Sequence, residues 1–215
     1  MDKELIFPHI DHTVLKPTAT ASDIDKLCEE ALKLNTASVC IPPYYVRYAK
    51  EKYPSLNICT VIGFPLGYSV SAIKCAEARQ AVLDGASEID MVVNLCAVKN
   101  GDFDEVEQEI ADVKAACGNA LLKVIVETCY LTDEEKIKLC GCVTRAKADY
   151  IKTSTGFGTD GARIEDILLF KQHIGADVKM KAAGGVRSRT DLEMFLEAGC
   201  DRIGTSSAVK LLSEE

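Results

Sequence analysis

The chain has 215 residues, of which 47% are hydrophobic and 27% are charged, and its formal net charge is −8. This length can bury one sizeable core, and about 200–250 residues is ordinary for a single α/β barrel, so we expect one domain over residues 1–215. The acidic balance argues against a nucleic-acid partner, whose binding needs a concentrated basic stripe.

The first residues, 1–5, lack the apolar core of a secretory signal, and no apolar run reaches the ~18–20 residues that cross a bilayer. We therefore expect a cytoplasmic protein without a membrane partner. The ten cysteines are scattered through apolar segments and form no Cys-x-x-Cys pair, which is typical of small buried residues in a reducing compartment. Cys140 and Cys142 are too close together for a typical zinc pair, so we expect no metal and no cofactor.

Short β-branched runs alternate along the chain with longer amphipathic stretches. The predicted strands are 10–14, 38–41, 58–62, 88–93, 121–126, 150–152, 177–180 and 202–204. Several are apolar on both faces, as in 121–126, which is typical of parallel strands that helices cover. A half-exposed antiparallel sheet would show strict alternation instead.

Between these strands the hydrophobic period becomes helical. Apolar residues keep i, i+3, i+4 spacing around 24–34, 103–113 and 192–199. Helix starts are predicted at Ser22, Thr132 and Ser188, because each hydroxyl is followed three residues later by an acid.

Eight strands that alternate with helices in so few residues predict a compact (β/α)₈ barrel. An open doubly wound sheet is the alternative. The glycine fingerprint that such a sheet needs after its first strand is missing.

Two lysines, Lys152 and Lys181, stand where the sixth and seventh predicted strands end. Residues at the carboxyl ends of barrel strands face the active site. An amine that is held beside a second cation and out of bulk water loses proton affinity, so one of the pair can be a free nucleophile near neutral pH. A surface lysine with its ammonium in water is the ordinary alternative, but two lysines at successive strand ends favour Schiff-base chemistry.

Three acidic residues and one hydroxyl lie on or beside the predicted strands. Asp90, in the fourth strand, is expected to converge with the two lysines inside the barrel mouth, either as a buried counter-ion or as a proton relay through water. Asp11 and Thr13 share a face of the first strand, where they either reach a substrate hydroxyl or stabilise a turn. Glu127, at the end of the fifth strand, has a comparable position.

Glycine-rich turns follow the seventh and eighth predicted strands, at 184–185 and 204–207. Backbone N–H groups in such turns, with the start of the short apolar helix that follows residue 207, can bind phosphate oxygens. A phosphate is therefore the expected occupant. Arg187 either adds charge to the same corner or is an exposed residue at a helix start.

At these residues the sequence resembles the deoxyribose-phosphate aldolases, a family of class I aldolases with a (β/α)₈ barrel. The resemblance runs through 10–20, 61–67, 88–94 and 150–157 to the two glycine turns, and it covers nearly the whole chain. It implies a reversible reaction in which acetaldehyde and D-glyceraldehyde 3-phosphate give 2-deoxy-D-ribose 5-phosphate, in deoxynucleoside breakdown. It also implies a homodimer.

By the same resemblance, Lys152 is the Schiff-base lysine, Lys181 is the lysine that perturbs its pKa, and Asp90 is the proton-relay carboxylate. The substrate is a small phosphorylated sugar or an aldehyde. The residues expected to bind the substrate or its phosphate are Asp11, Thr13, Gly156, Gly184, Gly185, Arg187, Gly204, Ser206 and Ser207.

Two positions depart from the family's pattern. Some members place a lysine directly after the Thr-Gly of the sixth strand's motif to help hold phosphate, where this chain has Phe157. Some also end in a tyrosine that folds over the site, whereas residues 211–215 contain none. We expect both contacts to be missing.

Two other functions fit the same residues. A Schiff-base aldolase for another phosphorylated sugar would share Lys152 and the phosphate turns, and substrate profiling separates it from the first reading. A non-catalytic sugar-phosphate-binding barrel would form no covalent adduct.

Overall fold

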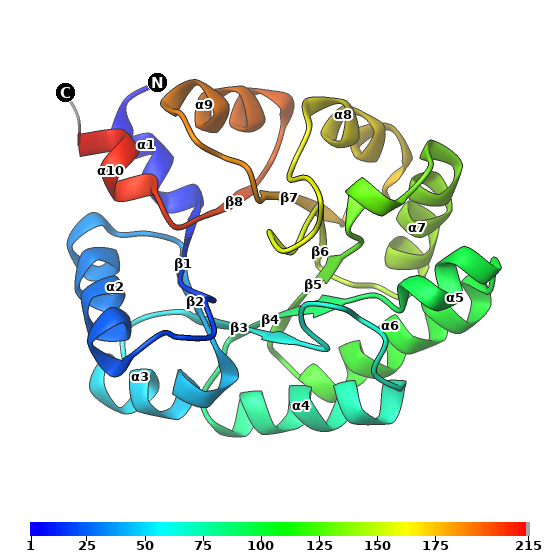
Figure 1. The fold of residues 1–215 in the computed structure, drawn as a ribbon, viewed down its shortest axis with the longest axis horizontal. Helices are drawn as coiled ribbons and strands as arrows, with labels where there is room; N and C mark the ends of the chain where they lie inside the picture. The colour runs from blue at the N-terminus through cyan, green and yellow to red at the C-terminus, as the bar shows by residue number, and fades with distance from the viewer. Residues whose placement is uncertain (214–215) are drawn as a thin grey trace.

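Eight parallel strands form a closed barrel in which β8 pairs with β1. In the computed structural model, which describes residues 1–213, each strand is hydrogen-bonded to the next in chain order (Figure 1). The strands are β1 Ile10–Thr13, β2 Ser38–Ile41, β3 Ile58–Ile62, β4 Glu88–Val92, β5 Leu121–Ile125, β6 Tyr150–Lys152, β7 Lys179–Ala183 and β8 Arg202–Thr205. The predicted (β/α)₈ barrel is confirmed, and the open doubly wound sheet is wrong because the two edge strands that it requires are paired.

Burial on both faces explains the apolar strand sequences. Every residue of β3 and β4 is buried, because helices cover the outside of the barrel and side chains fill its interior. Polar residues inside such a barrel need partners within the protein.

The seventh strand lies further along the chain than the sequence predicts. It runs from Lys179 to Ala183 rather than over 177–180, so Lys181 lies in the middle of the strand and not at its end. Alanine has a weak strand preference, but the parallel pairing of Ala182 and Ala183 with β8 continues the ladder. The strand ends at Ala183, because the next residue, Gly184, has a φ of +79° that breaks the extended backbone.

Helices follow the strands and surround the barrel (Figure 1). They are α1 Lys3–Ile6, α2 Ala21–Leu34, α3 Val46–Lys52, α4 Ser71–Leu83, α5 Leu95–Asn100, α6 Phe103–Cys117, α7 Asp133–Arg145, α8 Ile164–His173, α9 Arg189–Ala198 and α10 Ala208–Ser213. Figure 1 places α1 and α10 at the same edge of the ring. Among the described residues, no helix combines the length and the apolar character needed to cross a membrane.

Two of the three predicted helix starts are confirmed. Thr132 and Ser188 each form a capping box with the acid three residues on. The third prediction is wrong, since Thr20 caps α2 and Ser22 does not. The acid that Ser22 would need is Asp25, which instead accepts hydrogen bonds from tyrosines of the α3 region.

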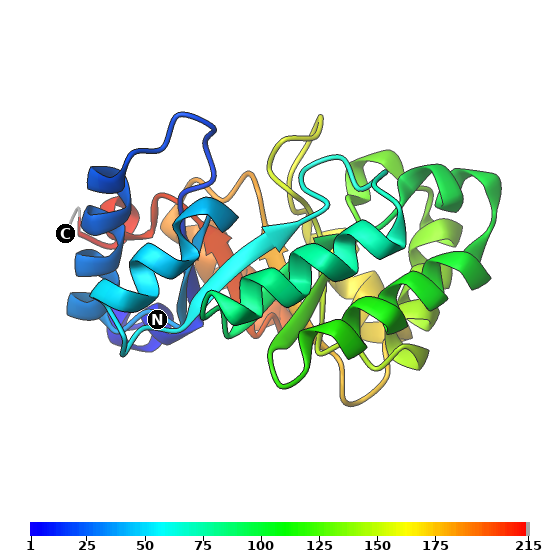
Figure 2. The same ribbon diagram turned by 90° about the horizontal axis from the view of Figure 1, so that it is seen from below.

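The loops after β1, β3 and β6 rise above the same end of the barrel (Figure 2). This is the end to which the strands point with their carboxyl termini, where barrel enzymes place their active sites. Figure 2 shows the three loops in blue, cyan and yellow, drawn from well-separated parts of the chain.

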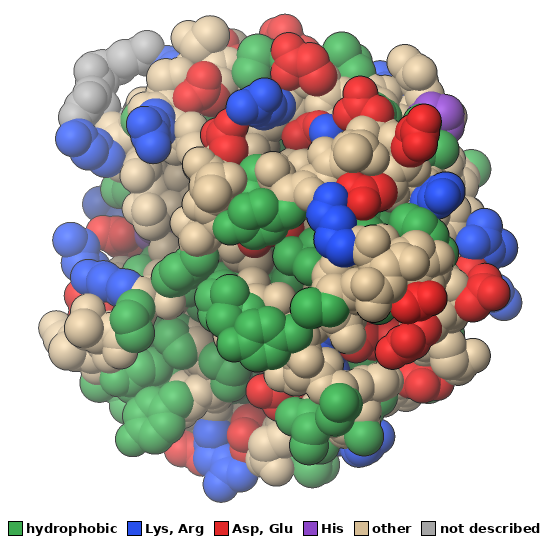
Figure 3. Space-filling view, turned by 45° about the vertical axis from the view of Figure 1, so that its right-hand side comes forward, with side chains coloured by type: hydrophobic (Ala, Val, Ile, Leu, Met, Phe, Trp, Pro, Cys, Tyr) green, Lys and Arg blue, Asp and Glu red, His purple; other side chains and the backbone are tan. Residues whose placement is uncertain are grey.

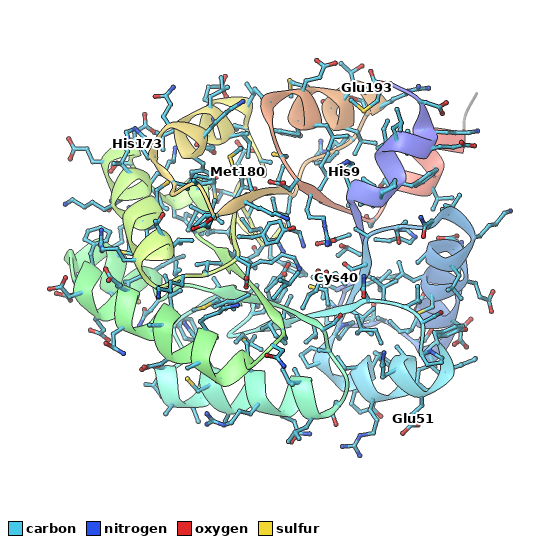
Figure 4. The ribbon with its side chains drawn as sticks, turned by 180° about the vertical axis from the view of Figure 1, so that it is seen from behind. His9, Cys40, Glu51, His173, Met180 and Glu193 are labelled. Carbon is cyan, nitrogen blue, oxygen red and sulfur yellow. The ribbon has the colours of Figure 1, made fainter. Side chains whose placement is uncertain are left out.

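Most of the cysteines are buried and all ten are free. Only Cys96 is exposed, and Cys129 is partly buried. Figure 4, seen from behind, shows Cys40 at the centre of the barrel, whereas His173 and Glu193 lie on its periphery. The expectation that most cysteines are small buried residues is confirmed.

Candidate active site

A cavity of about 400 Å³ opens at the carboxyl end of the strands. It lies between the ends of β1, β6, β7 and β8, and Lys152 lines it. The predicted substrate-binding residues on its lining are Thr13, Gly156, Gly184, Gly185, Gly204 and Ser206.

Two lysines converge on one carboxylate beneath this cavity. Lys152 Nζ donates to Asp90 Oδ2 at 2.7 Å, and Lys181 Nζ donates to the same oxygen at 2.8 Å. Lys152 is 3% exposed, while Asp90 and Lys181 have no exposed surface. The predicted convergence of these three side chains is present, although Lys181 reaches it from within a strand.

A third lysine, absent from the sequence prediction, binds the other oxygen of Asp90. Lys123 Nζ donates to Asp90 Oδ1 at 2.9 Å and forms an ion pair with Glu88 at 2.6 Å. Lys123 stands opposite Asp90 in the β4–β5 register, and Glu88 shares a face of β4 with Asp90 because side chains alternate along a strand. A charged residue in the middle of the apolar run 121–125 was the signal that could have revealed it.

The network closes on its far side through Arg202 and Asp11. Arg202 contacts Glu88 at 3.1 Å and Asp11 at 2.6 Å, and Asp11 accepts a hydrogen bond from Lys181 at 2.5 Å. Ser38 also donates to Asp11, at 2.8 Å. Cations and carboxylates thus alternate around a ring in the barrel interior.

This ring stays ionised because its members neutralise one another. Burial by itself would raise the pKa of Asp90, but Lys123, Lys152 and Lys181 hold it well below its usual range. Burial would lower the pKa of Lys181, but Asp11 and Asp90 raise it above the ordinary lysine value. Lys181 is therefore a fixed cation beside Lys152.

Lys152 differs from the other cations of the ring in its partners. Within the described chain Lys152 pairs with one carboxylate, Asp90, whereas Lys123, Lys181 and Arg202 each pair with two or more. A nucleophilic lysine must be a neutral amine. Loss of a proton from Lys152 therefore breaks fewer ion pairs than loss of a proton from any other cation of the ring. Lys152 is also the only member of the ring that lines the cavity.

Three of the expected substrate contacts lie elsewhere. Asp11 is fully buried and off the cavity lining, and it binds Lys181 and Arg202. Arg187 is exposed and lies off the cavity lining, with its backbone N–H bound to Asp191 at the start of α9. The structure thus agrees with the alternative interpretation of Arg187 as an exposed residue at a helix start.

The third is Ser207, which precedes α10 and lies off the cavity lining, unlike its neighbour Ser206. Its backbone N–H donates to Thr205 Oγ1 at 3.1 Å.

The phosphate-binding prediction rests on backbone that approaches closely and carries free donors. A Cβ added at Gly184 would lie 3.3 Å from Gly156 Cα, so the loops after β6 and β7 meet backbone to backbone. Gly185 has a φ of +74°. Among the described residues, the backbone N–H groups of Gly156, Gly185 and Ser206 have no acceptor in the protein, which leaves them available to an anion.

Phe157 contributes an apolar wall to the same cavity. Its ring packs edge to face against Phe64 with centroids 5.3 Å apart, and the residue is 52% exposed. Leu66 and Tyr68, in the loop after β3, are also exposed. Figure 3 shows hydrophobic side chains gathered on this side of the molecule.

Glu127 does not line the cavity and instead holds a neighbouring loop in position. It adopts a left-handed backbone conformation and accepts hydrogen bonds from the backbone N–H and the hydroxyl of Thr155. Burial raises the pKa of its carboxyl. Glu127 thus anchors the loop that carries Gly156 and Phe157.

Cys40, Cys59 and Asp90 present three possible metal-ligand atoms within 4.8 Å of one another. The Asp90 carboxylate is already bound by three ammonium groups. A divalent cation would have to compete with these charges at short range. The cluster is therefore better suited to ammonium binding than to metal coordination.

Comparison with known proteins gives a consistent result. Residues 5–208 match the model of the family described as DeoC/LacD family aldolase. A deoxyribose-phosphate aldolase of Clostridium botulinum (strain Alaska E43 / Type E3) is 59% identical over 100% of this chain and 98% of that protein. One of Clostridioides difficile (strain 630) is 54% identical over 98% of this chain and 96% of that protein.

Solved structures agree with this result. The tetrameric deoxyribose phosphate aldolase from Aeropyrum pernix superposes with a TM-score of 0.91 at 34% identity, over 99% of this chain and 91% of that one. An aldolase called QR15 gives a TM-score of 0.93 at 39% identity, over 97% of this chain and 95% of that one.

Proposed function

The chain belongs to the DeoC/LacD family of aldolases, and we propose that it cleaves 2-deoxy-D-ribose 5-phosphate to acetaldehyde and D-glyceraldehyde 3-phosphate through a Schiff base on Lys152. The relatives that match it from end to end carry the name of this activity. Two observations support the choice of nucleophile. Lys152 is the only cation of the buried ring that lines the cavity, and it has the fewest carboxylate partners.

The reaction begins at the C1 carbonyl of the open-chain sugar. The neutral amine of Lys152 adds to this carbon, and loss of water gives a protonated iminium. The C3 hydroxyl then loses its proton, and the electrons of the C2–C3 bond move towards the iminium nitrogen. D-Glyceraldehyde 3-phosphate leaves, and the enamine of acetaldehyde remains on Lys152.

Asp90 and Lys181 serve the proton transfers that complete the cycle. Enamine C2 takes up a proton, and water then hydrolyses the iminium to release acetaldehyde. Asp90 lies 2.7 Å from Lys152 Nζ and passes the proton through water. Lys181 remains positively charged and donates to the same oxygen of Asp90 that Lys152 binds.

We also propose that the whole chain is one catalytic domain, which works in the cytoplasm as a homodimer. The family model matches residues 5–208 as one unit, which supports a single domain over these residues. A solved relative is described as a tetramer, which supports association between identical chains. Light scattering after size-exclusion chromatography measures the oligomeric state.

Covalent trapping tests the nucleophile. Borohydride added with acetaldehyde should reduce the iminium and leave an ethyl group on the peptide that contains Lys152, as measured by mass spectrometry. Lys152→Ala should give no labelled peptide and no detectable cleavage, because Lys16, the other lysine on the cavity lining, is exposed and lies outside the buried ring. Lys179→Ala, at an exposed lysine of β7, is the matched control and should be labelled like the native protein.

Two outcomes would count against the proposal. Label on a different lysine would move the nucleophile, and turnover in a folded Lys152→Ala protein would exclude a Schiff base there. Substrate profiling decides between deoxyribose 5-phosphate and another phosphorylated sugar, because the preferred substrate has the larger kcat/KM.

A further inference from the structure

The lining of the active-site cavity carries two charged residues, and both are lysines. One is Lys152, which lies at the cavity floor and is held by Asp90. The other is Lys16, in the loop after β1. Since Lys152 is committed to the reacting carbon, Lys16 is the lining charge that remains for another part of the substrate.

Lys16 belongs to a segment that shapes the cavity wall. Leu15 and Pro17, on either side of it, line the same cavity. The same lining includes Gly185 and Ser206, whose backbone N–H groups have no acceptor among the described residues. An ammonium and free backbone donors around one space form the usual composition of a phosphate site.

The ammonium of Lys16 is free to turn towards this space. Its contact with the carboxylate of Asp23 is long, at 3.6 Å, and the Lys16 side chain is 58% exposed. Asp23 is committed to the cap of α2, because its other oxygen accepts hydrogen bonds from the backbone N–H and the hydroxyl of Thr20, both at 2.8 Å. A loose and exposed ion pair of this kind contributes little energy, so an anionic ligand can replace it.

Other nearby positions do not supply this charge. Arg187 lies off the lining of the cavity, and Phe157, which lies on it, is apolar. Lys26 and Lys210 line a neighbouring cavity that shares Lys16 and Ser206 with the active site, but they do not line the active site itself.

We propose that Lys16 binds the phosphate of the substrate and thereby sets the preference of this enzyme for phosphorylated over unphosphorylated sugars. The inference rests on the proposed aldolase function and names the side chain that complements its glycine turns. Lys16 supplies the positive charge from the loop after β1, while the turns after β7 and β8 supply backbone donors.

The test compares Lys16→Met with the native enzyme on 2-deoxyribose 5-phosphate and on 2-deoxyribose. A charged hydrogen bond corresponds to about a 10- to 100-fold change in binding. We expect kcat/KM for the phosphorylated sugar to fall by about this factor, mostly through a higher KM, while turnover of the unphosphorylated sugar changes far less. Inorganic phosphate should also become a weaker competitive inhibitor.

Two variants sharpen the result. Lys33→Met removes an exposed lysine of α2 that lies on neither cavity, so it should keep the native preference. The double variant Lys16→Met with Phe157→Lys places an ammonium at another position of the cavity lining and should recover part of the preference.

The proposal would be overturned if Lys16→Met left the ratio of kcat/KM for the two sugars unchanged, whether both values fell equally or neither fell. A double variant that stays as poor as the single one would overturn the view that the lost element is a positive charge. Failure of the aldolase function itself would look different. In that case the native enzyme would neither prefer the phosphorylated sugar nor give a borohydride-trapped Lys152 adduct with acetaldehyde, which carries no phosphate.

Discussion

The cysteines of this chain differ in burial, and we expect them to differ in reactivity for that reason. Burial raises the pKa of Cys28, Cys117, Cys140 and Cys200 to about 12. The thiolate is the reactive form of cysteine, so these four side chains act as small apolar residues at neutral pH. The number of thiols that react quickly should therefore follow the number of exposed cysteines and not the total of ten.

Native-state thiol titration checks this difference. At pH 8 we expect Cys96 to react fast, because it alone is exposed, and Cys129 to react more slowly. Cys96→Ser should remove the fast phase, whereas Cys140→Ser should leave it unchanged. Several fast-reacting groups in the folded Cys96→Ser protein would show that the buried thiols are accessible.

Among the secondary-structure elements, α2 shows how one of two candidate hydroxyl residues, Thr20 and Ser22, becomes the N-cap of a helix. The Thr20 hydroxyl accepts a hydrogen bond from the backbone N–H of Asp23, and the Asp23 carboxylate accepts one from the backbone N–H of Thr20. Ser22 offers the same sequence pattern, but its partner acid, Asp25, binds Tyr48 and Tyr53 instead. A tertiary contact of the acid thus decides which hydroxyl caps the helix.

This choice predicts different costs for two neighbouring substitutions. Thr20→Ala should lower the free energy of unfolding by about 1 kcal/mol, because an N-cap is lost. Ser22→Ala, at an exposed residue, should change it by less than about 0.5 kcal/mol. Urea unfolding followed by far-UV circular dichroism measures both, since the chain has no tryptophan. A larger loss of stability in Ser22→Ala than in Thr20→Ala would mean that Ser22 is the cap.

At the scale of the whole molecule, the ring of charges ties distant strands together. Its members come from β1, β4, β5, β6, β7 and β8, so it exists only when the barrel is closed. Removing one member leaves a buried charge without its partner, which typically costs about 3–5 kcal/mol. The same contacts that prepare Lys152 for chemistry therefore also depend on the complete fold.

Acid unfolding should report this ring. The carboxyls of Asp11 and Asp90 have folded-state pKa values far below the ordinary aspartate value of about 3.9. As the pH falls through that value, the unfolded chain takes up protons that the folded chain does not, so the folded state loses stability. Their contribution is complete above about pH 4 and is lost progressively below it.

The measurement is urea unfolding at several pH values between 2 and 7. We expect the free energy of unfolding to fall steeply below about pH 4 in the native protein. Asp11→Asn should be less stable at pH 7 but should show a shallower fall in acid, because one depressed carboxyl is gone. Parallel curves for the two proteins would mean that Asp11 does not contribute through its pKa.

Much of this protein follows from local sequence pattern. Seven of the eight strands and the glycine turn after β7 were predicted correctly in position, because strand periodicity and glycine backbone freedom are properties of short segments. The exception is β7, which lies further along the chain than predicted. The chemical role of Lys152 is a prediction that borohydride trapping tests, and the roles of Lys181 and Asp90 stay predictions.

Only the tertiary structure decided which charged groups meet. Lys123 and Asp90 are partners because β4 and β5 pair in one register, and Arg202 reaches Asp11 because β8 closes against β1. Lys16 and Ser206 border one cavity although almost the whole chain separates them. Short segments set the type and place of each element, but register, barrel closure and burial set the partners of a charge, and these depend on contacts between residues far apart in the chain.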